Sequence, residues 1–240
     1  MSGASPSGSP DQTLLAIRQC RYSVPGANGP RLLLDIPGFS VTRGEQVAIV
    51  GPSGTGKSTL LHLLAGLLSP EAGEVEVDGV RLDLLSEAGR DAFRAHRIGL
   101  VFQAFNLFQG LPVIDNLLLA GTLAGKTIRR EDAMEVLSQV GLADQAGQDP
   151  ARLSIGEQQR VAAARAVIHS PPILLADEPT ASLDPTNARN TMDLFLRLAA
   201  TKGCTLVVVS HDPATMDRVG RRVSIFDLNR ATAEPGRKGG

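Results

Sequence analysis

The sequence predicts an α/β fold built on a parallel sheet, with a mainly helical section inserted into it. In the first and last thirds of the chain, short apolar runs bounded by Gly and Pro alternate with helical patterns. Several of these runs are apolar throughout, which is typical of strands that helices cover on both faces. From about Ala104 to Val167, apolar residues instead recur at helical spacing.

The expected elements are short. The strands are Leu14–Tyr22, Leu32–Val41, Gln46–Val50, Glu74–Val80, Ile98–Phe102, Ile173–Ala176, Thr205–Ser210 and Arg222–Asp227. The helices are Lys57–Leu68, Arg130–Val140, Gly156–His169, Ala188–Ala200 and Pro213–Gly220. Residues 1–11 and 231–240 carry too little apolar surface to pack and are expected to form a disordered leader and tail. This leaves one domain over residues 12–230, with a helical subdomain at about 104–167.

Composition argues against several classes of protein. The formal net charge is −1 and no basic cluster stands out, so we expect no nucleic-acid partner. The apolar runs fall far short of the roughly 20 residues that span a bilayer, and no secretory signal opens the chain. Cys20 and Cys204 lie in separate apolar runs and are expected to be buried thiols rather than a disulfide or a metal site. We therefore expect a soluble, cytosolic protein.

The most specific motif is the glycine-rich segment Gly51-Pro52-Ser53-Gly54-Thr55-Gly56-Lys57-Ser58-Thr59. It lies between an expected strand and an expected helix, which is the context of a Walker A phosphate loop. Gly54 and Gly56 let backbone N–H groups turn toward phosphate oxygens, and the helix N-terminus adds positive potential. Lys57 supplies a charge for the terminal phosphates and Ser58 a hydroxyl for Mg²⁺. The flanking elements make a chance Gly-rich turn a poorer explanation than a nucleotide site.

Two later strands end in residues that suit phosphate chemistry. Asp177 and Glu178 follow one apolar strand, where Asp177 suits the surroundings of a metal ion and Glu178 a general base that polarises water. A solvated acidic turn is the alternative for this pair. His211 follows a second apolar strand and can sense the γ-phosphate, although a lone His there is more often a surface or capping residue.

In these motifs the chain resembles the ATP-binding cassette (ABC) ATPases, from roughly Ala16 to Asp227. The ordered series is Walker A, Gln103 in Val-Phe-Gln, the signature Leu153-Ser-Ile-Gly-Glu157, Asp177-Glu178, Ser182-Leu-Asp184 and His211. Walker A and the acidic pair are common to many P-loop proteins, whereas the signature with the later aspartate and histidine is specific to this family. The segments 101–107 and 175–180 are most similar to the branch of lipoprotein-release, macrolide-export and cell-division ATPases.

The resemblance implies a P-loop NTPase fold of the ABC type, with an N-terminal antiparallel β region. It also implies a head-to-tail dimer, in which Ser154, Ile155, Gly156 and Glu157 of one subunit close over ATP on the Walker A face of the other. Gln103 would link the γ-phosphate and Mg²⁺ to the helical subdomain, and Ser182 and Asp184 would communicate between the two sites. The metal would be held by Ser58, Gln103 and Asp177. Tyr22 occupies the place of an adenine-stacking aromatic, or is an ordinary strand residue.

The signature departs from the family pattern at Ile155, which replaces a glycine. Ser154-x-x-Glu157 also forms a capping box that would organise a helix N-terminus whatever its function. We expect ATP binding to survive and turnover to be reduced if Ile155 slows closure.

The function expected from the resemblance is a peripheral ATPase at the cytoplasmic face of the membrane, which drives a separate permease subunit. A regulatory ATPase of the cell-division type, which moves no cargo, is the alternative. Soluble ABC proteins of DNA repair or translation generally carry two cassettes, long coiled coils or zinc insertions, which this chain lacks. A small-molecule kinase would lack the signature.

Overall fold

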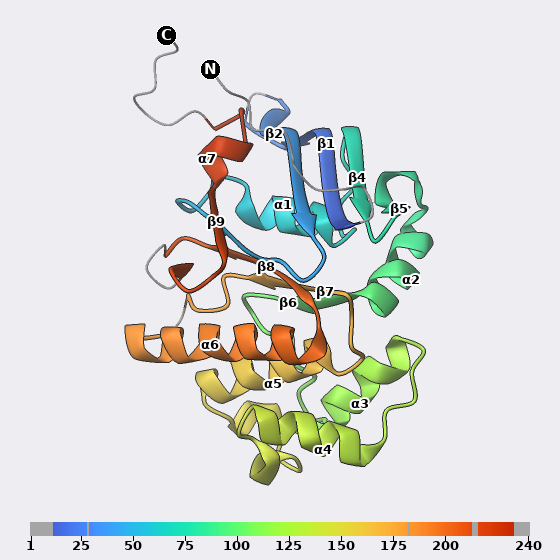
Figure 1. Cartoon of the computed structure of the whole chain (residues 1–240), viewed down its shortest axis with the longest axis vertical. Coiled ribbons are helices and arrows are strands. Elements are labelled where there is room, and N and C mark those ends of the chain that lie inside the picture. The colour runs from blue at the N-terminus through green and yellow to red at the C-terminus, as the bar shows by residue number, and fades with distance from the viewer. Residues whose placement is uncertain (1–11, 28, 182, 213–215, 233–240) are drawn as a thin grey trace.

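Two β-sheets lie on either side of helix α1 (Lys57–Leu64), as Figure 1 shows. The computed structural model describes residues 12–27, 29–181, 183–212 and 216–232. The first sheet is antiparallel, in the order β2-β1-β4-β5, and the second is parallel, in the order β6-β7-β8-β3-β9. The strands are β1 (Thr13–Val24), β2 (Arg31–Thr42), β3 (Gln46–Val50), β4 (Ala72–Val77), β5 (Val80–Arg81), β6 (Ile98–Val101), β7 (Ile173–Asp177), β8 (Thr205–Ser210) and β9 (Arg221–Ser224). The predicted parallel sheet and antiparallel N-terminal region are both confirmed.

The central strands are apolar throughout because each of their faces packs against a different core. In β3, Val47 and Ile49 join the core around α1 and the first sheet, whereas Ala48 and Val50 join the core around the later helices. β7 and β8 alternate in the same way. Side chains of successive strand residues point to opposite faces, so a strand covered on both sides cannot alternate with polar residues.

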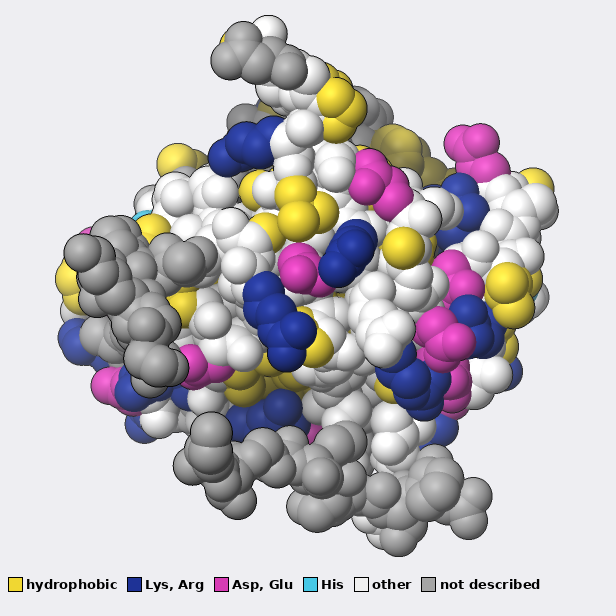
Figure 2. Space-filling view, turned by 90° about the horizontal axis from the view of Figure 1, so that it is seen from above, with side chains coloured by type: hydrophobic (Ala, Val, Ile, Leu, Met, Phe, Trp, Pro, Cys, Tyr) yellow, Lys and Arg dark blue, Asp and Glu magenta, His cyan; other side chains and the backbone are white. Residues whose placement is uncertain are grey.

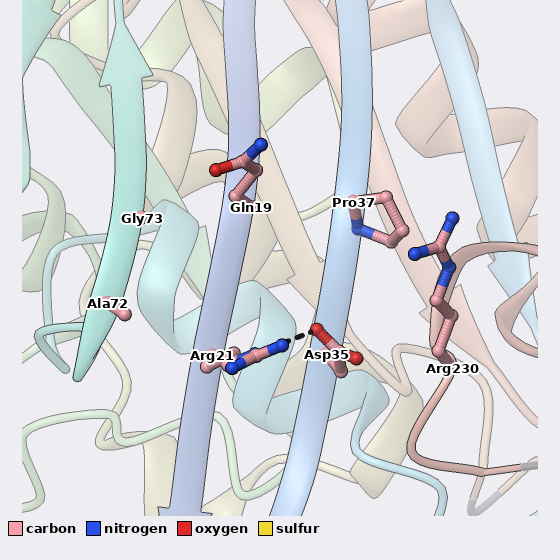
Figure 3. Close-up of a pocket in the computed structure, with 7 residues that line it drawn as sticks. All are labelled: Gln19, Arg21, Asp35, Pro37, Ala72, Gly73 and Arg230. Atoms are coloured by element: carbon pink, nitrogen blue, oxygen red, sulfur yellow. Dashed lines mark hydrogen bonds and ion pairs between the residues drawn. The ribbon is translucent and has the colours of Figure 1, made fainter.

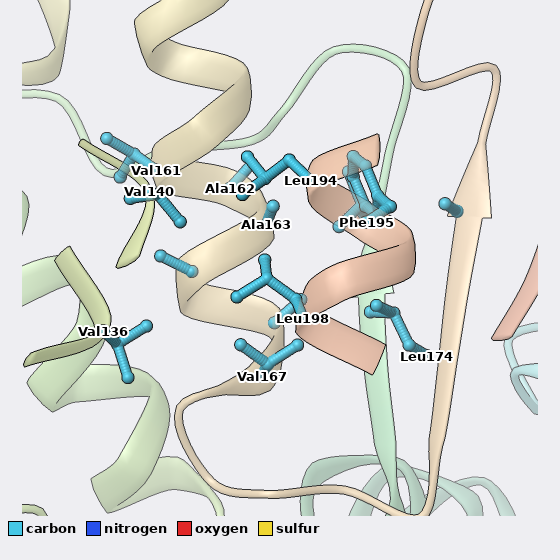
Figure 4. Packing of buried hydrophobic residues seen from close by; sticks show 14 of the residues in the cluster. Val136, Val140, Val161, Ala162, Ala163, Val167, Leu174, Leu194, Phe195 and Leu198 are labelled. Carbon is cyan, nitrogen blue, oxygen red and sulfur yellow. The ribbon is translucent and has the colours of Figure 1, made fainter. Parts of the chain in front are cut away.

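Four helices lie beyond the other face of the parallel sheet, two in contact with the sheet and two packed against one of those helices. They are α3 (Val113–Leu123), α4 (Arg130–Gln139), α5 (Ile155–Val167) and α6 (Pro185–Lys202). Figure 4 shows Ala162 and Ala163 of α5 facing Leu194 and Leu198 of α6. Small alanine side chains let the two helices approach closely while remaining apolar. Helices α3 to α5 lie between β6 and β7 in sequence, where the helical section was expected.

Several predicted boundaries are wrong for identifiable reasons. Helix α1 stops at Leu64 rather than Leu68 because Gly66 adopts a left-handed conformation at φ 67° and ends it. The single strand predicted over 74–80 is a hairpin, since Asp78 and Gly79 form the turn with φ of 49° and 75°. The last predicted strand ends early, and Ser224 caps helix α7 (Ile225–Leu228) instead.

Helix α2 (Glu87–Arg97) was not predicted. None of its residues is buried, and its apolar face consists of small alanines and Phe93 among many charged residues, so the apolar signal was weak. Of the predicted helix at 213–220, the described residues 216–220 do not form an α-helix. Some predicted features lie outside the described residues: the expected leader, residues 233–240 of the expected tail, residues 213–215 and Ser182.

The charged side chains of the first sheet are largely paired. Arg18 lies 3.1 Å from both Glu74 and Glu76, and Arg21 lies 3.2 Å from Asp35. The face seen in Figure 2 accordingly mixes basic and acidic side chains without a continuous basic field. Over the described ranges, no helix combines the length and the apolar character needed to cross a bilayer.

Candidate nucleotide-binding site

Three neighbouring strands deliver the predicted catalytic motifs to one edge of the parallel sheet. In the order β7-β8-β3, the strands lead into Glu178, His211 and Gly51 respectively. The sheet ladder continues into the site, because Gly51 N donates to Ser210 O at 3.2 Å and Glu178 N donates to Val209 O at 3.0 Å. The carboxyl ends of parallel strands are where ligands bind in α/β proteins.

The phosphate loop leaves the N-terminus of α1 open. Gly56 is the N-cap residue at φ 93° and contributes no side-chain hydrogen bond to the first turn. A Cβ at Gly56 would lie 2.6 Å from Leu34 Cδ2, so both the backbone conformation and the packing require glycine. The first N–H groups of α1 therefore have no capping side chain in front of them. An open helix N-terminus of this kind attracts phosphate oxygens.

Lys57 lies almost fully buried at the base of the loop, with 4% of its surface exposed. Its Nζ donates to the carbonyl oxygen of Pro52 at 3.0 Å and lies 3.4 Å from Glu178 Oε1. Thr55 Oγ1 donates to the same Pro52 oxygen at 2.8 Å. The ammonium group is thus held at the centre of the loop, where a triphosphate would meet a full positive charge.

Ser58 and Asp177 join the loop to the end of β7. Ser58 Oγ donates to Asp177 Oδ1 at 2.8 Å. Burial raises the pKa of Asp177, and the Ser58 hydrogen bond opposes that change. His62, one helical turn after Ser58, has its Nε2 3.8 Å from Asp177 Oδ2. This histidine was missed because a lone His at the i+4 position of a phosphate-loop helix belongs to no motif.

Glu178 is held from two directions. Its Oε2 accepts a hydrogen bond from His211 N at 3.1 Å, and His211 Nδ1 lies 2.7 Å from the same oxygen. Its backbone is left-handed at φ 46°, an uncommon conformation for a residue with a Cβ. Glu178 is 9% exposed, whereas nearly half of the His211 side chain is exposed. The carboxylate is consequently fixed in place while the imidazole faces the cleft.

These side chains line a cleft of about 470 Å³. The predicted residues in its wall are Ser53, Gly54, Gly56, Lys57, Ser58, Thr59, Gln103, Glu178 and His211, and the unpredicted ones are Val24, Arg31 and Leu33. Tyr22 is not in this wall and packs against the core around α1, so its stacking on adenine stays a prediction. Val24 and Arg31 were missed because no motif precedes the phosphate loop in this region.

Another hollow, of about 550 Å³, lies on the first sheet over β1, β2 and β4 (Figure 3). Arg21 and Asp35 pair across it, and Gln19, Pro37 and Arg230 also line it. No residue of the phosphate loop reaches this surface. The convergence of charged and hydroxyl groups at the strand ends distinguishes the 470 Å³ cleft as the candidate site.

The signature lies in a separate groove. Ser154, Ile155 and Gly156 line a groove of about 720 Å³ together with Arg160, Leu183 and residues of α4 and α6. None of the residues that line this groove lines the phosphate-loop cleft. One subunit therefore presents a nucleotide cleft and a signature groove as distinct surfaces.

The predicted capping box is present at the start of α5. Glu157 N donates to Ser154 Oγ at 3.3 Å, while Ser154 N donates to Glu157 Oε2 at 2.9 Å. The Ser154 hydrogen bonds lower the pKa of Glu157. Ile155 is 54% exposed, and a Cβ on Gly156 would meet no atom within 4 Å. The backbone at Gly156 is thus open to approach from outside, with Ile155 beside it.

Asp184 caps helix α6. Its Oδ1 accepts from the backbone N–H groups of Thr186 at 3.0 Å and Asn187 at 3.1 Å, and these bonds lower its pKa. Leu183 and Asn187 line the signature groove, so Asp184 lies next to it. A capping function accounts for its local position, whereas communication between sites stays a prediction.

Comparison with known proteins identifies the family. The model of the family described as ABC transporter matches residues 34–181. The chain belongs to the ABC transporter family. This finding confirms the resemblance and the fold class. Membership of this family also confirms the predicted function, an ATP-hydrolysing subunit of an ATP-driven transporter.

Similar proteins agree with this assignment. The chain is 41% identical over 197 residues to an uncharacterized ABC transporter ATP-binding protein, Rv0986 of Mycobacterium tuberculosis, with 81% of this chain and 79% of that protein covered. It is 40% identical to the lipoprotein-releasing system ATP-binding protein LolD of Nitrobacter winogradskyi, with 80% and 84% covered. A dimeric structure of a post-hydrolysis state of the ATP-binding cassette MJ0796, bound to ADP and Pi, is 33% identical with a TM-score of 0.82 and covers 92% of this chain and 96% of that one.

Proposed function

We propose that this ABC ATPase works as a head-to-tail homodimer at the cytoplasmic face of a membrane, where it drives a separate integral membrane protein. The observation that carries the proposal is the separation of two surfaces on one chain. The phosphate-loop cleft holds the charged groups that suit ATP, and the signature groove lies elsewhere. A site assembled from both surfaces therefore needs two subunits.

ATP binding would depend on the segment 51–59. Its backbone N–H groups and the N-terminus of α1 would surround the β- and γ-phosphates. Lys57 is already directed into the loop through its bond to Pro52 O, so a phosphate oxygen would find the ammonium group preorganised. The apolar side chains of Val24 and Leu33 in the same wall suit the base or the ribose.

Hydrolysis would use Glu178 as the general base. Hydrogen bonding from His211 N orients one carboxylate oxygen, which leaves the carboxylate positioned to accept a proton from water at the γ-phosphate. His211 and Gln103 line the same cleft and would contact the γ-phosphate side of the nucleotide. In this arrangement electrostatic positioning, rather than covalent catalysis, lowers the barrier.

The residues present fit Mg²⁺. Ser58 Oγ and Asp177 Oδ1 lie within hydrogen-bond distance of each other, and Gln103 offers an amide oxygen in the same cleft. Among the described residues, no group of three or more His, Cys, Asp or Glu side chains forms a protein-only metal cage. Oxygen donors in small number are what Mg²⁺ uses when phosphates and water complete its coordination. When bound, the ion would neutralise charge on the β- and γ-phosphates.

The comparisons support the partners in this proposal. The relatives named LolD and MetN are ATP-binding proteins of lipoprotein release and methionine import, and the cassette MJ0796 is described as a dimer. By analogy the present chain would act with a permease subunit and a second copy of itself. The closed site would pair Ser154, Ile155, Gly156 and Glu157 of one copy with ATP on the other.

A complementation experiment tests the shared site. Lys57→Met damages the phosphate loop and Ser154→Arg blocks the signature, so each homodimer should hydrolyse ATP very slowly. In a mixed dimer, the intact phosphate loop of the Ser154→Arg chain meets the intact signature of the Lys57→Met chain. Half of the dimers in a random mixture carry one such site, so we expect recovery of roughly a quarter of the wild-type rate, on the assumption that the sites act independently.

The mixture must be shown to contain the heterodimer, for which two affinity tags and a pull-down suffice. No recovery in a confirmed heterodimer would overturn the shared site. Activity of both variants alone would overturn the assignment of the residues.

A further inference from the structure

Two consecutive residues just after Gln103 adopt left-handed backbone conformations. Phe105 has φ 58° and Asn106 has φ 49°. Asparagine tolerates this region, but in an aromatic residue the steric conflict of the Cβ with the backbone is not relieved. The local bonds from Phe105 N to Phe102 O and from Asn106 N to Ala104 O tighten the turn. A pair of this kind persists only where its surroundings hold it in place.

Arg165 supplies that restraint from a distant part of the chain. Its Nη2 donates to Phe105 O at 2.7 Å and its Nη1 to Asn106 O at 2.5 Å. The guanidinium therefore forms hydrogen bonds to the carbonyl groups of both left-handed residues. Within the part of the chain that the structure describes, no carboxylate forms an ion pair with Arg165, and burial lowers the pKa of its guanidinium. The guanidinium is therefore stabilised mainly by its hydrogen bonds to these two carbonyl groups.

The position of Arg165 on α5 connects this loop to the signature. Helix α5 begins directly after Ser154, whose capping box fixes its first turn, and Arg165 lies near the other end of the helix. A rigid helix thus runs from the groove that contains Gly156 to the loop that follows Gln103. Movement of the signature would be carried along α5 to the two carbonyl groups.

We propose that Arg165 is a positioning residue that fixes the loop after Gln103 to the signature helix, so that Gln103 keeps its place in the wall of the nucleotide cleft when the dimer closes. The proposal rests on the shared-site function described above. Arg165 touches neither nucleotide nor metal in this scheme. Its contribution requires two donors in a fixed planar arrangement, which lysine cannot provide.

Arg165→Met and Arg165→Lys test the proposal, with Arg90→Met as a matched control. Arg90 also donates to two backbone carbonyls, of Gly66 at 3.1 Å and Leu85 at 2.9 Å, but it lies on α2. We expect both Arg165 variants to lower kcat by roughly tenfold or more while KM for ATP stays within about twofold. Arg90→Met should reduce stability without lowering kcat.

Hydrogen exchange provides a readout that general destabilisation would not reproduce. In the Arg165 variants, exchange should rise at residues 103–107 and remain unchanged in segment 51–59. In a Glu178→Gln background, ATP should protect residues 103–107, and adding Arg165→Met should remove this protection while leaving the dimer intact.

Asn106 offers an independent route to the same loop. Asn106→Ala disfavours the left-handed conformation and should lower kcat as Arg165→Met does, whereas Asn106→Gly should retain activity. The double variant Arg165→Met/Asn106→Ala should be no slower than the slower single variant, since both changes release the same loop.

Three results would overturn the proposal: wild-type kcat in Arg165→Met, full activity in Arg165→Lys, or exchange that rises equally across the fold. Any of them would leave the complementation of Lys57→Met by Ser154→Arg intact. Failure of the proposed function would instead abolish that complementation, so the two failures are distinguishable.

Discussion

Lys57 Nζ lies 3.4 Å from Glu178 Oε1, and both side chains are nearly excluded from solvent. The cation of the phosphate loop and the proposed base therefore face each other across the end of β8, although they come from helix α1 and the end of β7. A substitution of Lys57 should therefore affect ATP binding, whereas a substitution of Glu178 should affect hydrolysis.

Glu178→Gln should retain ATP binding and lose turnover. The amide oxygen can still accept from His211 N, so the geometry of the cleft is preserved, but the side chain no longer accepts a proton. We expect the hydrolysis rate to fall by about 10²–10⁴-fold. Size-exclusion chromatography with ATP should then show a long-lived dimer, and wild-type turnover in this variant would refute the general-base role.

Lys57→Met should weaken ATP binding. The ammonium would contact a charged phosphate in the proposed site, and the loss of such a hydrogen bond corresponds to about 10–100-fold in Kd. Titration with a fluorescent ATP analogue would measure this change. Lys202→Met, at the end of α6, is the control and should bind like the wild type; equal affinity in both variants would exclude the phosphate-loop assignment.

Ile155→Gly should raise the rate of hydrolysis without changing the affinity of a single subunit for ATP. Ile155 is more than half exposed beside the open backbone of Gly156, where its branched side chain would meet the approaching subunit. The relevant comparison is kcat with Mg-ATP for the two proteins at equal dimer concentration. Equal values would show that Ile155 does not hinder closure.

His169 should make the stability of the fold depend on pH. Burial, together with the nearby charges of Lys126 and His96, lowers its pKa to about 4 from the ordinary 6.5. Between pH 6.5 and pH 4 the unfolded chain binds this proton and the folded chain does not, so stability falls as the pH falls. The contribution across that window is on the order of 3 kcal/mol.

Urea unfolding at pH 7.0, 5.5 and 4.5 would measure that dependence. His169→Leu should lose less stability than the wild type as the pH falls, whereas His96→Gln should follow the wild type more closely, because the charge of His96 influences the pKa of His169 less than burial does. An unchanged pH dependence in His169→Leu would show that this histidine is not responsible.

The sequence was most informative where structure is local. The phosphate loop, the capping box at Ser154 and the continuous apolar strands follow from motif, spacing and periodicity, and each appears at its expected place. The grouping of the strand ends was also predictable, because the carboxyl ends of parallel strands share an edge. Short-range rules therefore accounted for most of the nucleotide cleft.

Contacts between distant residues could not be predicted in this way. Arg165 binds carbonyl groups about 60 positions earlier, and no local pattern encodes such a bond. Helix α2 was missed because none of its side chains is buried and charged residues dominate its sequence, so few apolar residues mark its inner face. The turn at Asp78-Gly79 did carry a sequence signal, the Asp-Gly pair typical of hairpins, which the strand prediction passed over.

The order of the parallel sheet also bears on how this protein is made. Strand β3, which leads into the phosphate loop, lies between β8 and β9, and both of these neighbours follow residue 204. A nascent chain on the ribosome therefore carries β3 with both hydrogen-bonding edges unpaired until the residues after 204 have been synthesised. Unpaired strand edges favour aggregation, and strands that lie as far apart in the sequence as β3 and β8 pair slowly. A chain that ended before residue 205 would therefore hold the phosphate loop on a strand without either of its neighbours.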